Sequence, residues 1–438
     1  MRHGLAVRKY SRLTFSNPPT RDTMSTATPV QPQGRHPTGP RRAADDLIPL
    51  WVVFGLAMGP AVALGLSRFA YALLLPAMRS DLHWSFADAG TMNTANAAGY
   101  LAGALVASTI GKRAGDKRTF ALGLLLTALA VGASGLTADF TMLLILRIAA
   151  GFTGALAFVT GAGLTSAAAA GGSSSRAPTL LGIYFAGAGI AVTASALAVP
   201  PLLDAMGWRG GWLVLGALAL AATMLGCLAL RRAPTPVYPS AGQARGNWSL
   251  KFMTRGLIAY GLFGAGYIAY ATFIIAFLRG EQGFTNANIT IFWSILGLAS
   301  VAAAFLWGPV LGRLRGGRGI AATICMVMVG AAVPLLWPGQ IGAYLSAVLF
   351  GGSFLAVVAS AAAFARKSAP PQSWTAAIGA MTIAFGLGQC IGPILIGLLS
   401  DGPSGVRAGL WVSVGILLVG VMVAAWQPEP CSEGDGKT

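Results

Sequence analysis

Arg68 and Arg147 are the only charged residues away from the ends of the long apolar stretches of this 438-residue chain. A charge within an apolar region is costly, so it usually meets a partner or faces a polar cavity. Each of the 13 acidic residues lies in a tail, in a loop or at the end of a stretch. Because guanidinium groups bind carboxylates through paired hydrogen bonds, both arginines are candidate ligands for an anion. The competing interpretation is that water and backbone carbonyls satisfy them.

A smaller set of uncharged polar residues accompanies the arginines. Asn93, Asn96 and Tyr100 are spaced i, i+3 and i+7, which places them on one helical face. This stripe either lines a substrate path or forms hydrogen bonds to a neighbouring helix. Three tyrosines share a face of a later helix, where core packing is the favoured role, and Gln389 is the lone amide of its stretch. The candidate substrate-binding residues are Arg68, Tyr71, Asn93, Asn96, Tyr100, Arg147, Tyr267, Tyr270 and Gln389.

Proton coupling would require a titratable carrier, and no carboxylate lies at membrane depth. If protons drive transport, the candidates are Asp81 and Asp88, beside the outer ends of the first two apolar stretches. Facilitated diffusion or exchange is the alternative.

Several classes of function lack the residues they need. The chain has three histidines and four scattered cysteines, so neither a metal site nor a redox pair is expected. No G-x-x-x-x-G-K-[ST] phosphate loop occurs, and no catalytic set lies at membrane depth. The formal charge of +17 is spread over short clusters rather than one solvated domain. We therefore expect no enzyme, no cofactor, no metal and no nucleic-acid partner.

Composition indicates an all-α membrane protein. Apolar residues make up 55% of the chain and charged residues only 10%, whereas soluble domains have about 25% charged residues. Most of the apolar stretches reach the roughly 20 residues that a helix needs to cross a bilayer. Twelve stretches, in two groups of six, are expected at 50–75, 86–110, 120–136, 140–165, 178–203, 212–230, 256–278, 287–311, 319–337, 341–365, 374–399 and 410–426.

The predicted organisation follows from these stretches. Residues 1–46 form a disordered cytoplasmic tail, because they contain no apolar run. A six-helix bundle at 47–230 is joined by a cytoplasmic link at 231–255 to a second six-helix bundle at 256–426. Residues 427–438 form a second cytoplasmic tail.

The basic residues between the stretches indicate the orientation. With the N-terminus in the cytoplasm, fifteen Lys and Arg residues lie in inside loops and four in outside loops, as the positive-inside rule requires. The inside residues are Lys112, Arg113, Lys117, Arg118, Arg176, Arg231, Arg232, Arg245, Lys251, Arg255, Arg313, Arg315, Arg318, Arg366 and Lys367. The outside residues are Arg79, Arg209, Arg279 and Arg407. This count predicts a multi-pass protein of the inner, or plasma, membrane with both termini in the cytoplasm.

A weak internal repeat relates the two groups of stretches. Gly65, Gly111 and Gly187 have counterparts 201 residues later, and the basic segment GKRAGDKR at 111–118 recurs loosely as GRLRGGRG at 312–319. Two pseudo-symmetric bundles are the arrangement expected of facilitator transporters.

From about residue 50 to 426, the sequence resembles the major facilitator superfamily, within it the YbfB/YjiJ-like branch. The resemblance rests on six strings in order, each in a predicted helix. They are GLSRFAYALLLPAM at 65–78, NTANAAGYLAGAL at 93–105, LRIAAGFTGA at 146–155, GIYFAGAGIAV at 182–192, AYGLFGAGYIAYATF at 259–273 and GLGQCIGP at 386–393. It implies a major facilitator fold, with Arg147 near the first helix and facing a central cavity.

The resemblance also implies a gating loop between the second and third helices. Its residues here are Gly111, Lys112, Arg113, Asp116, Lys117 and Arg118. The superfamily pattern has an acidic residue four positions after the first glycine, but Gly115 stands there and Asp116 follows. The charge relay that the superfamily pattern implies between this loop and the neighbouring helices is therefore altered in this sequence.

The function expected is secondary transport of a small molecule by alternating access, in a monomer embedded in the lipid bilayer. Arg68 and Arg147 are both placed about 12 to 15 Å below the outer surface, from the 1.5 Å rise per helical residue. An organic anion held by both is the substrate hypothesis. The alternatives are export of neutral or lipophilic compounds, and a non-transporting sensor or scaffold.

The orientation generates a direct prediction. A cysteine introduced at Arg209 should react with an impermeant thiol reagent added outside intact cells, whereas one at Arg315 should react only after the membrane is opened. Labelling of position 209 from the cytoplasmic side alone would contradict the twelve-helix topology.

Overall fold

In the computed structural model, the described residues are 48–170, 176–236, 250–314, 316–370, 373–403 and 405–428. They belong to the unit Asp46–Thr438, and their regular structure is helical. The predicted tail at 1–46, part of the predicted link (237–249), Arg315 and residues 429–438 lie outside the described residues.

The first half of this unit contains six helical segments. The first segment is a succession of α2 (Leu50–Leu56), α3 (Met58–Pro60), the π-helix η1 (Ala61–Phe69) and α4 (Tyr71–Asp81). The others are α5 (Phe86–Ala114), α6 (Asp116–Ala133), α7 (Phe140–Ala170), α8 (Arg176–Ala198) and α9 (Pro200–Leu230). One membrane-spanning stretch at 50–75 was expected here, and the structure divides it into these elements and continues it to Asp81.

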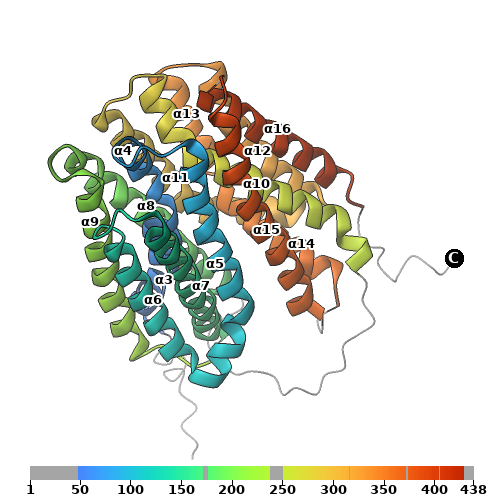
Figure 1. The fold of residues 1–438 in the computed structure, drawn as a ribbon. Helices are drawn as coiled ribbons and strands as arrows, with labels where there is room; N and C mark the ends of the chain where they lie inside the picture. The colour runs from blue at the N-terminus through green and yellow to red at the C-terminus, as the bar shows by residue number, and fades with distance from the viewer. Residues whose placement is uncertain are drawn as a thin grey trace, which may run out of the picture. The chain divides into compact units, whose positions relative to one another are not determined.

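The second half repeats this arrangement. A 3-10 turn, η2 (Leu250–Met253), precedes α10 (Thr254–Gly280), α11 (Asn286–Arg313) and α12 (Arg318–Leu336). The fourth segment consists of α13 (Gln340–Gly351) and α14 (Phe354–Ser368), and the last two are α15 (Trp374–Ser400) and α16 (Gly405–Ala425). In Figure 1 the blue-to-green helices and the yellow-to-red helices form two groups, and α5 and α15 adjoin where these groups meet.

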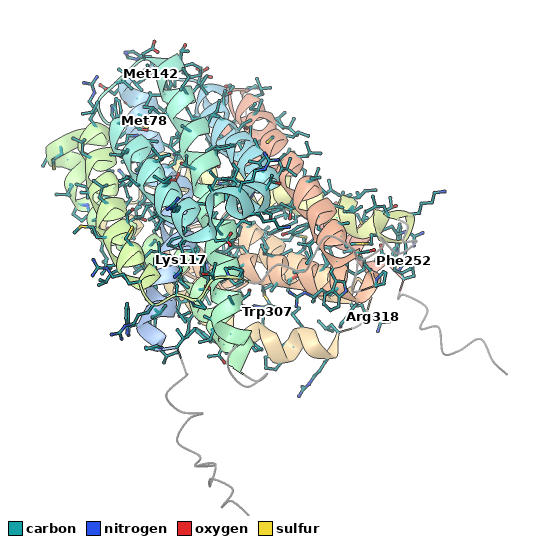
Figure 2. The ribbon with its side chains drawn as sticks, turned by 90° about the horizontal axis from the view of Figure 1, so that it is seen from below. Met78, Lys117, Met142, Phe252, Trp307 and Arg318 are labelled. Carbon is teal, nitrogen blue, oxygen red and sulfur yellow. The ribbon has the colours of Figure 1, made fainter. Side chains whose placement is uncertain are left out.

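The segments agree with a membrane protein. Among the described residues, ten are long and apolar enough to cross a bilayer. The other two, α5 and α6, carry more polar residues, and α6 opens with the charged run Asp116, Lys117 and Arg118. Side chains project from the outer faces of the helices (Figure 2). Several large apolar side chains are 57 to 75% exposed, among them Met224, Leu225, Leu306, Ile391 and Leu398, as expected of a surface in contact with lipid.

The segment expected as a gating loop is not a loop. Gly111, Lys112 and Arg113 belong to the last turn of α5, and Asp116 begins α6. Only Gly115 separates the two helices, with a φ of +89° that favours glycine. The Asp116 side chain is buried beside Gly111, where a Cβ would collide with its carboxylate. The Lys and Arg residues of the segment from Gly111 to Arg118 therefore lie on two helix ends that are joined by one residue.

Local geometry repeats between the halves. Ser85 caps α5 in a reciprocal hydrogen-bonded box with Asp88, and Thr285, 200 residues later, caps α11 in the same way with Asn288. Two residues before each cap, the backbone has positive φ, 54° at His83 and 65° at Gly283. The same turn is thus built twice.

One end of the interface between the halves is closed by a carboxylate on a helix terminus. Asp401, which follows α15, accepts hydrogen bonds from the backbone N–H groups of Phe86 (2.7 Å) and Ala87 (3.0 Å) at the start of α5. An anion is favoured there because the first N–H groups of a helix are unpaired and carry partial positive charge. Gly90 and Gly397 allow the two helices to approach, since a Cβ on either would meet backbone atoms of the other helix.

Asp401→Ala should loosen this end of the interface. The expected loss is the stabilisation of a helix N-terminus by an exposed negative charge, which is about 0.3 to 1 kcal/mol. A cysteine placed at Ala276, on the wall of a nearby cavity, should react faster with an impermeant maleimide once the bond is lost, in a background free of native cysteines.

Asp139→Ala is the matched control, because Asp139 accepts a hydrogen bond from Met142 N–H within its own half. Equal labelling rates in the Asp401 variant, the control and the parent would show that Asp401 does not hold the halves together.

Candidate functional site

Arg68 lies in the π-helix η1 and is 2% exposed. Its Nε donates to Asn96 Oδ1 at 3.0 Å, and its Nη1 donates to Gln389 Oε1 at 3.0 Å. The guanidinium carbon is 4.6 Å from the centroid of the Tyr100 ring, within range of a cation–π interaction. Among the residues that the structure describes, Nη2 has no hydrogen-bond partner. One donor group of this buried cation is therefore available.

Gln389 connects this arginine to the second half. It is fully buried on α15, and its Nε2 donates to the Tyr267 hydroxyl of α10 at 2.5 Å. A chain of polar contacts therefore runs from Asn96 through Arg68 and Gln389 to Tyr267. These residues, together with Tyr100, form the group that we call the central cluster.

Arg147 on α7 occupies a neighbouring position. Its Nη1 donates to the backbone oxygen of Ser67 at 2.6 Å, while Nε and Nη2 have no hydrogen-bond partner in the described segments. The guanidinium carbon lies 5.0 Å from the Tyr71 ring centroid and 5.3 Å from that of Trp212. Arg147 therefore binds one backbone carbonyl, as expected from the competing interpretation in which carbonyls satisfy the arginines. Its Nε and Nη2 remain available to a ligand.

Asn96 joins the two arginines. Besides accepting from Arg68, it donates from Nδ2 to the backbone oxygen of Arg147 at 3.2 Å and to Ser67 Oγ at 3.4 Å. Close packing of α5 on α7 makes these contacts possible, because a Cβ on Gly99 or Gly151 would collide with a carbonyl of the opposite helix. Small residues thus bring the amide to the Arg68 guanidinium and to the backbone carbonyl of Arg147.

The remaining predicted residues lie apart from the central cluster. Tyr71 donates from its hydroxyl to Ala89 O at 2.9 Å and presents its ring to Arg147. Asn93 donates to Thr272 Oγ1 at 2.5 Å, with its Oδ1 unpaired. Tyr270 shares a hydrogen bond of 2.5 Å with Ser346.

Three residues of this region were missed from the sequence. Ser67, Trp212 and Thr272 contact predicted residues, but none is distinguishable from other serines, tryptophans or threonines in apolar stretches. Their roles depend on tertiary contacts.

The proposed proton carriers have structural partners. Asp81 Oδ2 accepts from Trp208 Nε1 at 2.8 Å, and Asp88 forms the capping box of α5. Within the described residues, no hydrogen bond or ion pair joins a carboxylate to Arg68 or Arg147, and no group of three potential metal ligands occurs.

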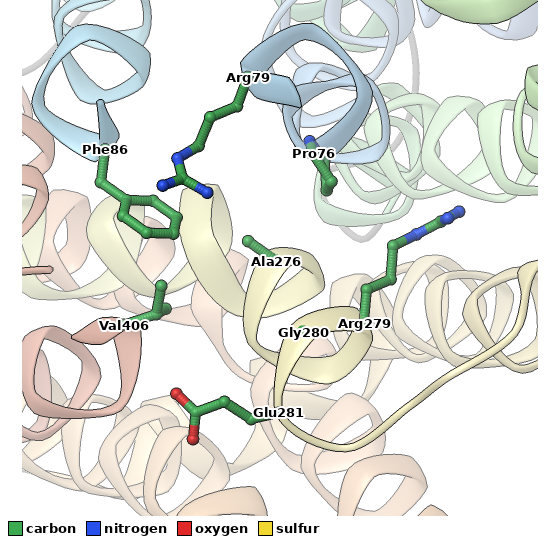
Figure 3. A pocket seen from close by; sticks show the side chains of 8 residues that line it. All are labelled: Pro76, Arg79, Phe86, Ala276, Arg279, Gly280, Glu281 and Val406. Atoms are coloured by element: carbon green, nitrogen blue, oxygen red, sulfur yellow. The ribbon is translucent and has the colours of Figure 1, made fainter. Parts of the chain in front are cut away.

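A separate cavity of about 430 Å³ lies between the ends of α4 and α10. Figure 3 shows that the Arg79 guanidinium lies against the Phe86 ring, whereas Arg279 points away from Arg79. The Arg79 guanidinium carbon is 3.6 Å from that ring centroid, and Arg279 donates to Asn286 Oδ1. The two cations do not converge, so this cavity is a weaker candidate for an anion site than the central cluster.

Comparison with known proteins identifies relatives of the chain. A family model described as "Uncharacterised MFS-type transporter YbfB" matches residues 60–425. The transporter YycB of Bacillus subtilis (strain 168) is 24% identical over 369 residues, which cover 80% of this chain and 85% of that protein. The tetracenomycin C resistance and export protein of Streptomyces glaucescens is 25% identical over 234 residues, 51% of this chain and 43% of that protein.

Solved structures share the fold. The nucleoside transporter NupG superposes with a TM-score of 0.66 at 16% identity, covering 86% of this chain and 98% of NupG. A bacterial homologue of the human lysosomal transporter Spinster, inward-facing and occupied, gives a TM-score of 0.61 at 16% identity, covering 89% and 97% of the two chains. The predicted fold, two bundles of six helices in the major facilitator arrangement, is confirmed.

Asn96→Ala should destabilise the protein, because it leaves Arg68 Nε buried and unpaired and removes the contact with Arg147. An unpaired buried donor costs about 1 to 3 kcal/mol, and thermal unfolding in detergent should show the loss.

Thr91→Ala is the control, since the Thr91 hydroxyl donates only to Ala87 O of its own helix. If the two variants unfold at the same temperature, Asn96 is not the structural link inferred from its hydrogen bonds.

Proposed function

Since the chain belongs to the family of MFS-type transporters represented by YbfB, we propose that it is a secondary transporter that moves a small organic anion by alternating access. As a family member with many apolar helices, it is a multi-pass membrane protein. The proposal concerns the charge of the substrate, the residues that bind it, and the mechanism.

The unpaired donors of the two arginines carry this proposal. Arg68 Nη2, Arg147 Nε and Arg147 Nη2 are buried and have no partner among the described residues. A buried polar group without a partner is destabilising, and more so when it belongs to a charged side chain. A carboxylate would accept from such donors and would neutralise charge that no protein carboxylate neutralises.

The position of the central cluster also supports the proposal. Arg68 and Asn96 belong to the first half, whereas Gln389 and Tyr267 belong to the second. A substrate that replaces or reinforces these contacts would change how strongly the halves attract each other at this point. Alternating access requires such a differential interaction with two conformations.

The competing proposal is export of a neutral or lipophilic compound. The similarity to the tetracenomycin C export protein favours it, although the match covers 43% of that protein. In this case the unpaired donors would bind water or uncharged oxygen atoms, and Arg68 could be replaced without loss of transport.

The remaining features of the proposal follow from the sequence. We place the protein in the inner membrane as a monomer with both termini in the cytoplasm. Protons are the proposed coupling ions, with Asp81 and Asp88 as carriers, and the helix ends at Gly111 to Arg118 are the proposed gate.

Arg68→Lys and Arg68→Gln test the anion site. Lysine keeps the charge but loses the planar fork, and glutamine loses the charge. Both should lower uptake into proteoliposomes by at least about 10-fold, the ratio that corresponds to 1.4 kcal/mol. The substrate for this assay is the compound that most stabilises the purified protein in a thermal-shift screen of metabolites and drugs.

Arg209→Lys is the matched control, because Arg209 is exposed and lies over Trp208. If both Arg68 variants transport the identified substrate as well as the parent, the anion site is wrong and the competing proposal is favoured.

A further inference from the structure

Four aromatic rings of the second half stand nearly parallel beside the central cluster. Tyr260, Phe263 and Tyr267 follow one face of α10, and Phe385 projects from α15. Their planes differ by 11 to 16°, and their centroids are 4.6 to 5.9 Å apart. We call these four residues the aromatic stack.

The aromatic stack ends at the guanidinium group of Arg68. Tyr267 belongs to the stack and accepts the hydrogen bond of Gln389, which in turn accepts from Arg68 Nη1. The Gln389 amide therefore links the flat aromatic wall to the buried cation, and Tyr267 also interacts directly with Arg68. The unpaired Nη2 lies on this same guanidinium.

The rings differ in exposure. Tyr260, Phe263 and Tyr267 are at most 4% exposed, whereas Phe385 is only half-buried. Tyr100, whose ring lies 4.6 Å from the Arg68 guanidinium carbon, is also half-buried. Phe385 and Tyr100 are therefore the rings at this site that are exposed enough to contact a ligand.

Phe385 and Tyr100 lie at the same level of the interface. The residues that follow them, Gly386 and Leu101, are in contact, since a Cβ on Gly386 would lie 2.7 Å from the Leu101 side chain. One half thus supplies Arg68 and Tyr100, and the other supplies Phe385 and the rest of the aromatic stack.

We propose that the substrate is a planar aromatic carboxylate, with its carboxylate on Arg68 and its ring packed against Phe385 and Tyr100. This inference rests on the proposed anion site and adds the shape of the rest of the molecule. Aromatic rings prefer offset-stacked or edge-to-face partners, which gives them an advantage beyond their buried area. An aliphatic ring of the same size and charge lacks that advantage.

Three probes separate charge from ring type: benzoate, cyclohexanecarboxylate and benzamide. Thermal unfolding of the full chain purified in detergent is followed at increasing concentrations of each. Benzoate should give the same rise in unfolding temperature at a concentration about 5-fold lower than cyclohexanecarboxylate, the ratio expected from aromatic packing. Benzamide, which has no charge, should give no shift. Partition into the micelle would favour the less polar cyclohexane ring, so it cannot imitate this order.

Substitutions at the site show which residues cause the preference for benzoate. Phe385→Leu should remove the preference for benzoate while leaving stabilisation by both carboxylates, and Tyr100→Leu is a second variant from the other half if the first does not fold. Arg68→Gln should abolish stabilisation by either carboxylate. Phe284→Leu is the control, because Phe284 packs on Tyr344 away from the central cluster, and it should keep the 5-fold ratio.

The outcomes distinguish the two levels of proposal. Equal potency of benzoate and cyclohexanecarboxylate, both lost in Arg68→Gln, overturns the aromatic inference and leaves the anion site standing. A preference for benzoate that survives in Phe385→Leu and in Tyr100→Leu also overturns it. Absence of stabilisation by either carboxylate, or stabilisation that persists in Arg68→Gln, overturns the anion site itself and the inference that rests on it.

Discussion

The polar contacts inside this protein depend on two buried guanidinium groups, neither of which is paired with a carboxylate among the described residues. A charge removed from water must be compensated by hydrogen bonds, ring faces or an opposite charge. Here amides, backbone carbonyls and aromatic rings compensate Arg68 and Arg147 only in part, and three guanidinium nitrogens have no hydrogen-bond partner in the described part of the chain. Asn96, Gln389 and the Ser67 carbonyl all bind one of these two side chains. A ligand could supply the hydrogen bonds and the negative charge that are still missing.

The first segment is distorted where it holds Arg68. Arg68 and Ser67 lie in a π-helical stretch, in which Ala70 N–H donates to Gly65 O five residues back. Such turns change the direction of side chains and free backbone groups, and they occur often at functional sites. The carbonyl of Ser67 accepts from Arg147. Distortion of the first segment and close packing of α5 on α7 thus act together to bring Asn96 within hydrogen-bond distance of the Arg68 side chain and of the Arg147 backbone.

Much of the fold, but less of the site, could be predicted from the sequence. Apolar length gave twelve segments, and the rarity of charge inside them singled out Arg68 and Arg147, because both signals are local. The π-helix has no local signal comparable to a proline or a cap, so the apolar stretch at 50–75 could not indicate it. The helix ends at Gly111 to Arg118 were expected as a loop, since charge and glycine usually mark one, but a single glycine with positive φ suffices.

Contacts between distant segments were the least predictable part. Asn96 and Gln389 could each be recognised as an amide in an apolar stretch, but not as joint partners of Arg68, because 321 residues separate Arg68 from Gln389. The same holds for the aromatic stack, in which Phe385 inserts among rings of α10. A tyrosine at helical spacing is most often core, and Tyr270, bonded to Ser346 away from the central cluster, follows that rule.

The two halves share a scaffold but not a charge. In the first segments of the halves, Tyr71 faces Arg147 of α7, whereas Tyr270 bonds Ser346 of α13. Each tyrosine lies three residues after a residue that binds Gln389, which is Arg68 in the first half and Tyr267 in the second.

Where the first half has two cations, the second has a tyrosine and a serine. Both members of the pair Arg68 and Tyr267 nevertheless bind Gln389. Positive charge therefore comes from one half and the aromatic and amide surface from the other, so a molecule with an anionic group and an apolar body would be held between unlike surfaces in one defined orientation.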